Sequence, residues 1–161
     1  MRRILIYVLI LIVLLFLPLK SNDIGKLQPV EVVQVYRQGG EVLIRTDTGD
    51  QGVGKTAELA LQNLKDTTPG NIYLDTAEYL LLNKEASGDI EKLRPVLRKS
   101  LQLCFAETEV DLQLAAKFLP AHGNFPQLKR WKQGDDLPLL TVEGSRLKFM
   151  KKNVEKSQKT S

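Results

Sequence analysis

Eight residues of this 161-residue chain have the types and spacing of a phosphate-binding loop. Gly49 to Thr56 fits the pattern Gly-x-x-x-x-Gly-Lys-(Ser/Thr) without a gap. In such a loop the glycines let backbone N–H groups converge on phosphate oxygens, Lys55 would reach the terminal phosphates, and Thr56 would hold Mg²⁺. Nucleotide binding through Gly49, Gly54, Lys55 and Thr56 is therefore one hypothesis for this chain.

A second interpretation of the same residues is structural. The strand expected before them, 41–46, belongs to a hairpin, whereas a nucleotide-binding loop follows a buried parallel strand. The candidate for a second carboxylate on the Mg²⁺ side, Asp75, comes directly after the helix that the loop would open. We therefore favour a structural role, in which these residues form a glycine-rich loop between the hairpin and a helix that begins near Thr56. We expect no cofactor.

Three other groups of residues could carry chemistry. Asp47-Thr48-Gly49 matches the aspartic-protease triplet, in which paired carboxylates share a proton, but Asp50 would add repulsion to such a site. His122 is the single histidine, whereas a zinc site needs three or four convergent ligands. The single cysteine, Cys104, lies in an apolar stretch and is typical of a small core residue. We expect no catalytic residue, no metal site and no enzymatic activity.

An uninterrupted apolar run dominates the start of the sequence. Two arginines precede residues 4–19, which carry no charge. With the polar ends of the next two side chains at the interface, the run just reaches the length that spans a bilayer. A cleaved signal peptide has a similar start but needs a pair of small residues, and 17–21 offers none. We expect residues 1–21 to be an uncleaved single-pass anchor in the cytoplasmic membrane.

The formal charge of +4 is carried by the two ends of the chain. Residues 146–161 are rich in Lys and Arg and hold a single Glu, whereas 4–145 has more acidic than basic residues. A nucleic-acid partner is therefore not expected. Soluble domains translocate despite modest flanking charge, so we expect the domain to lie outside the cytoplasm. Residues 151–161 are predicted to be a disordered basic tail, and binding of an anionic cell-wall polymer or lipid headgroups by this tail is an alternative role.

Hydrophobic patterning predicts one small α+β domain over residues 30–150, joined to the anchor by a linker, 22–29. Residues 47–55 are expected to be a loop. A mixed sheet with about three helices is expected. The expected strands are 30–36, 41–46, 72–74, 78–82, 101–105, 139–142 and 146–149, and the expected helices are 56–64, 87–97 and 109–119.

A further pattern extends through most of this domain. Its elements are Gly52, Gly54, Thr56, Ala60 and Leu64, then 72–75, 80–86, Leu93 to Arg98, and Ala115, Ala116 and Leu119. Their order resembles the N-terminal domain of the Ger(x)C family, the C-subunit lipoproteins of spore germinant receptors. The resemblance covers about residues 30–120, and it marks the chain as a truncated, divergent relative that has an apolar run in place of the family's lipobox Cys.

The resemblance implies a function without catalysis. In the family the Gly-Lys-Thr sequence is a loop that enters a helix, and no catalytic residues carry over. We expect a membrane-anchored extracytoplasmic accessory or binding protein, linked to sporulation or germination, with an integral membrane protein as its partner. The alternative is a P-loop nucleotide-binding protein that uses Gly49 to Thr56, which requires the domain to face the cytoplasm.

Overall fold

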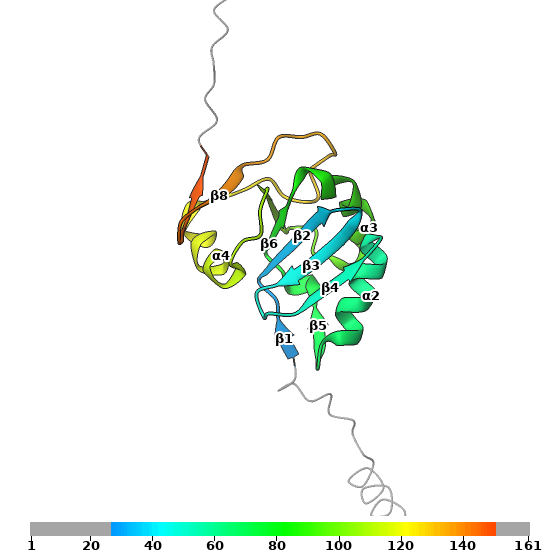
Figure 1. Cartoon of the computed structure of the whole chain (residues 1–161). Coiled ribbons are helices and arrows are strands. Elements are labelled where there is room, and N and C mark those ends of the chain that lie inside the picture. Colours follow the sequence, from blue (N-terminus) through cyan, green and yellow to red (C-terminus); the bar gives the residue numbers. More distant parts are fainter. Residues whose placement is uncertain (1–26, 151–161) are drawn as a thin grey trace, which may run out of the picture.

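The structure is a computed structural model that describes residues 27–150 (Figure 1). The expected anchor, 1–21, and the expected tail, 151–161, lie outside the described residues. Within 27–150, no helix is long and apolar enough to cross a membrane. The strands are β1 Leu27–Pro29, β2 Val32–Gln38, β3 Glu41–Thr46, β4 Gln51–Gly54, β5 Asn71–Tyr73, β6 Tyr79–Leu82, β7 Gln102–Ala106, β8 Leu139–Glu143 and β9 Arg146–Phe149. The α-helices are α2 Ala57–Thr67, α3 Ile90–Leu93 and α4 Leu112–Phe118, and the 3₁₀ turns are η2 Leu74–Thr76, η3 Lys84–Asp89, η4 Arg94–Val96 and η5 Pro120–His122.

The main sheet is mixed, as the sequence predicts. Its strand order is β4-β3-β2-β6-β7-β8-β9. The four central strands β2, β6, β7 and β8 run parallel to one another, and antiparallel strands flank them: β3 and β4 beyond β2, and β9 beyond β8. All four residues of β6 are buried, as expected for a central parallel strand that is covered on both faces. The described part of the chain is therefore a small α+β domain with three α-helices.

The two faces of the sheet have separate cores. Alternation along β2 and β6 sends Val33 and Leu80 to one face and Val32 and Leu81 to the other. Helices α2 and α3 and the buried Trp131 cover the first face, and α4 covers the second. Figure 1 shows α2 and α4 on opposite sides of the domain.

A short strand precedes the main sheet. β1 pairs in parallel with β5, Leu27 opposite Asn71 and Pro29 opposite Tyr73. The Thr76 hydroxyl extends this pairing, because it accepts from the Val30 N–H at 3.1 Å and donates to the Tyr73 carbonyl at 2.7 Å. The folded domain therefore includes Leu27–Pro29, although 22–29 was predicted to be a linker.

Other element boundaries differ from expectation. Residues 51–54 form strand β4, although 47–55 was predicted to be a loop. The helix predicted over 87–97 is divided into η3, the four-residue α3 and η4, where Pro95 lies in the first turn. Helix α4 begins at Leu112, after Asp111, whose side chain accepts from the Leu114 N–H and caps it.

Buried polar side chains fix the carboxyl ends of the central strands. Asn83 follows β6, and its amide bonds both the N–H and the carbonyl of Arg37 at the end of β2, at 3.0 and 2.8 Å. The Arg37 guanidinium then forms two 2.8 Å hydrogen bonds with Asp89, which is 5% exposed.

A second buried polar contact lies on the other face of the sheet. The fully buried Gln34 donates to the Thr108 carbonyl at 2.9 Å and accepts from the Val110 N–H. These two hydrogen bonds hold the segment before α4 against β2.

The Arg37–Asp89 pair gives a stability prediction. Asp89→Asn keeps the side-chain volume but leaves the partly buried guanidinium without its charged partner, so we expect a loss of about 2 kcal/mol in the free energy of unfolding. The matched control is Lys92→Ala, which breaks the exposed pair with Glu58 at 3.6 Å and is expected to cost less than about 1 kcal/mol. Urea unfolding of both variants measures the difference, and equal losses would contradict the role given to Asp89.

Candidate functional site

The residues of the phosphate-loop pattern lie in a turn and a strand. Gly49 has φ +94° in the turn after β3, a conformation that suits glycine. Residues Gln51–Gly54 then pair antiparallel with β3, so Gly52 is opposite Ile44 and Gly54 is opposite Val42. In a phosphate-binding loop, successive N–H groups converge on one point. Here alternate backbone groups of β4 are directed to β3 instead.

The glycines allow helix α2 to approach β4 closely. A Cβ at Gly52 would overlap the carbonyl oxygen of Ala60, and a Cβ at Gly54 would overlap the Ala60 nitrogen. The Thr56 hydroxyl caps α2 by accepting from the Leu59 N–H at 3.3 Å. Lys55 is exposed between the strand and the helix. Gly54 and Thr56 therefore have clear structural roles, in agreement with the structural interpretation of the pattern.

The Asp-Thr-Gly triplet is part of the same turn. The Asp47 carboxylate accepts from the backbone N–H of Glu31 at 3.2 and 3.3 Å. Thr48 donates to the Asp50 carboxylate at 2.7 Å. These contacts join the turn after β3 to the segment between β1 and β2, so the carboxylates serve as local hydrogen-bond acceptors.

His122 and Cys104 lie in different environments. Cys104 is fully buried in the core under α4, as predicted, and burial raises the pKa of its thiol from 9.0 to about 12. His122 is exposed at the end of η5, where its ring stacks on Phe118 with centroids 3.8 Å apart. Its Nδ1 lies 2.8 Å from the Phe118 carbonyl oxygen. Among residues 27–150, no three His, Cys, Asp or Glu side chains are placed to hold a metal ion.

An apolar groove lies between the end of α4 and the β8–β9 hairpin. Its volume is about 590 Å³. Its lining residues are Phe118, His122, Thr141, Glu143, Leu147, Lys148, Phe149 and Met150. Met150 is 60% exposed and Val142, on the same hairpin, is 43% exposed. Apolar side chains of this size and exposure, gathered at one edge of a sheet, are typical of a surface that contacts another molecule.

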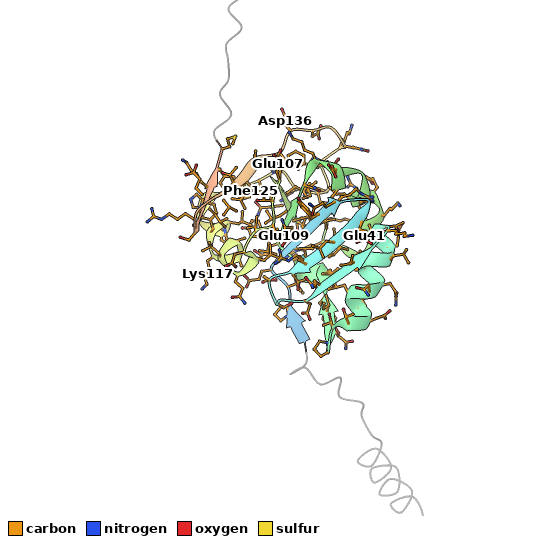
Figure 2. All side chains as sticks on the ribbon, viewed as in Figure 1. Glu41, Glu107, Glu109, Lys117, Phe125 and Asp136 are labelled. Atoms are coloured by element: carbon orange, nitrogen blue, oxygen red, sulfur yellow. The ribbon has the colours of Figure 1, made fainter. Side chains whose placement is uncertain are left out.

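Aromatic rings fix the shape of this groove. Phe149 of β9 lies 5.6 Å from Phe118 and 5.1 Å from Phe125, measured between ring centroids. Phe125 also contacts Tyr79 of β6 edge-on, at 6.2 Å. Figure 2 shows Phe125 on the β8 side of the domain, and Lys117 directed outward from α4. The ring cluster therefore connects the hairpin to the core and gives the groove a rigid wall.

The groove was not recognised from the sequence. The sequence pattern predicts Leu147 and Phe149 in a terminal hairpin and His122 on the surface, but it does not show that these residues lie close together. The available signal was the alternation of Arg146, Leu147, Lys148 and Phe149, which is that of a strand with one apolar and one basic face.

Comparison of the chain with family models, with curated proteins and with solved structures finds no match. The chemistry of the site is therefore inferred from its geometry. The groove offers apolar contact, two aromatic rings at its wall and the backbone of an edge strand, a combination suited to binding a polypeptide.

The packing of α2 on β4 gives a prediction that separates the two interpretations of the phosphate-loop pattern. Gly52→Ala should lower the free energy of unfolding by about 2 kcal/mol or more, because the strand and the helix must move apart. Lys55→Ala should leave the free energy of unfolding nearly unchanged. Titration with ATP should give the same calorimetric result for Lys55→Ala as for the unsubstituted chain. Micromolar ATP binding that is lost in Lys55→Ala would favour the nucleotide hypothesis.

Burial of Cys104 gives a second prediction. The fold favours the protonated thiol, so its stabilising contribution is present below pH 9 and is lost as the pH rises toward about 12. Iodoacetamide should alkylate Cys104 at least about tenfold more slowly in the native chain than in urea at pH 8. Equal rates with and without urea would show that the thiol is accessible. The free energy of unfolding should fall above pH 9, and less steeply in Cys104→Ala.

Proposed function

We propose that this chain is a membrane-anchored protein whose α+β domain lies outside the cytoplasm and binds an integral membrane protein without performing catalysis. The observation that carries the proposal is the uncharged run 4–19 followed closely by the folded domain. From residue 19 to Leu27 there are few residues, and a fully extended chain of that length spans at most about 28 Å. An anchor at 4–19 would therefore keep the β1–β5 end of the domain at the membrane surface.

The position of the groove supports a binding role. Figure 1 shows β1 and β8 at opposite ends of the domain. A domain held at its β1 end would present the β8–β9 hairpin away from the lipid, where the extracytoplasmic part of a neighbouring membrane protein can reach it. The proposal of a non-enzymatic role is supported by the structural use of Gly52, Gly54, Thr56 and Asp47, whose contacts serve helix packing, capping and a turn.

The resemblance to the Ger(x)C family suggests the biological setting. Its glycine pattern corresponds here to the strand that packs beneath α2. On that basis we propose that the partner belongs to a membrane assembly that acts in sporulation or germination. The partner would be an integral protein of the same bilayer, because an anchor at 4–19 would hold this chain in that membrane.

Membrane insertion can be tested with a reporter fused after Ser161. The full chain should remain in the membrane fraction at high salt, and a reporter that works only outside the cytoplasm should be active. Leu11→Arg combined with Leu14→Arg should release the chain, because each charge near the centre of a span costs about 3 kcal/mol. Leu11→Ile with Leu14→Ile is the matched control. A reporter that is active only in the cytoplasm would contradict the proposal.

The partner can be tested by affinity capture of the full chain from its native membranes after mild solubilisation. We expect an integral membrane protein to co-purify, and we expect its recovery to fall when the arginine variant of the anchor is used. Recovery of no membrane protein above background would contradict the binding function.

A further inference from the structure

The two edges of the main sheet are treated differently by the rest of the fold. At the β4 edge, the register turns the backbone groups of Gln51 and Val53 outward. Helix α2 covers both positions: the Val53 N–H donates to the Asn63 side chain at 3.0 Å, and the Thr67 hydroxyl lies 3.3 Å from the Gln51 carbonyl oxygen. Side chains of α2 therefore occupy the positions that an additional strand would need.

At the β9 edge, the backbone groups of two residues are directed outward. The Met150 N–H donates to the Leu139 carbonyl at 2.9 Å, so bonded and non-bonded pairs alternate from that point along β8 and β9. Leu147, opposite Val142, and Phe149 fall in the non-bonded positions. Their N–H and C=O groups are consequently directed away from β8, toward the open edge of the sheet. These are the groups through which an added strand pairs with an edge.

The side chains of β9 specify what such a strand should carry. Leu147 and Phe149 lie on the α4 face of the sheet, beside the apolar groove. Arg146 and Lys148 alternate with them, so they lie on the opposite face, and both are exposed. An added strand would place its residues directly beside these two rows. Its apolar side chains would then contact Leu147 and Phe149, and its acidic side chains would contact the basic row.

Charge excludes a second copy of β9 as the best occupant. Pairing of β9 with itself would bring the Arg146 and Lys148 rows of two chains together, and like charges on neighbouring strands are destabilising. Lys148 contacts Glu143 within its own hairpin at 3.3 Å, but the Lys148 side chain remains 63% exposed and can contact a further carboxylate. The edge is therefore complementary to a segment of a different protein that supplies negative charge.

We propose that β9 binds an extended segment of a partner protein as an additional strand, in which apolar residues alternate with acidic ones. The inference rests on the proposed binding function and names the chemistry of its partner. Backbone hydrogen bonds to Leu147 and Phe149 provide the pairing, the groove provides apolar contact, and Arg146 and Lys148 select the sequence.

The charge requirement can be tested with two synthetic peptides. One alternates valine and glutamate, the other alternates valine and lysine, and each is titrated into the full chain in detergent by calorimetry. The glutamate peptide should bind in the micromolar range. Arg146→Glu with Lys148→Glu should weaken it about tenfold and should create binding of the lysine peptide. The control, Lys99→Glu with Lys129→Glu, makes the same charge change at exposed positions outside the hairpin and should leave binding unchanged.

The backbone requirement can be tested by N-methylation of the glutamate peptide. Residues that face one side of a strand also direct their N–H groups to one edge, so methylation of either the valines or the glutamates removes the donors of a single edge. Strand addition predicts that one methylated peptide loses binding and the other retains it. Retention in both, or equal loss in both, would overturn the proposal.

Three further outcomes are decisive. If the glutamate peptide does not bind and sedimentation shows that the chain dimerises through Phe149, a second copy occupies the edge and the proposal is wrong. If the peptide binds as expected while the reporter places the chain in the cytoplasm, the strand-binding edge is supported and the proposed membrane function fails. If a membrane protein is captured equally by the Arg146→Glu, Lys148→Glu variant, the binding function stands and the role of β9 fails.

Discussion

The close contact between β4 and α2 determines how the rest of the domain is assembled. Gly52 and Gly54 have no side chains at the two points where the helix backbone approaches the strand. This contact places Ala57, Ala60 and Leu64 in the core of the first face. Helix α2 also connects the hairpins formed by β2, β3 and β4 with the later strands β5 and β6. The same helix covers the β4 edge, so among residues 27–150 β9 is the edge of the main sheet that an added strand could join.

The local elements of the fold could be predicted from the sequence because their signals are local. The alternation along β2 and β3 and the Gly39–Gly40 turn predict the first hairpin. The helix expected over 56–64 corresponds to α2, which continues to Thr67. Strand β4 was assigned to a loop because its two glycines are typical of turns. Their actual role depends on a helix that packs against them, which composition alone does not reveal.

The candidate site required the structure because its parts meet through tertiary contacts. Phe118 and Phe149 are far apart in the sequence, and their rings come within 5.6 Å only because α4 packs over the hairpin. Strand order was equally inaccessible, since an edge strand and a central strand can share the same alternating pattern. The alternation of basic and apolar residues in β9 was visible, but its meaning depends on the adjacent groove and on the open edge.

The location of Trp131 has a practical consequence. It is the one tryptophan of the chain, it is 3% exposed, and it lies in the core on the α2 and α3 face. Arg94 holds its segment in place by donating to the carbonyls of Leu128 and Trp131 at 2.9 and 2.8 Å. The indole emission of Trp131 therefore reports on the core between the sheet and helices α2 and α3. The apolar groove lies on the opposite face, beside Phe118 and Phe149. Binding there is therefore expected to leave the Trp131 emission unchanged, whereas unfolding of the core around Trp131 should shift it.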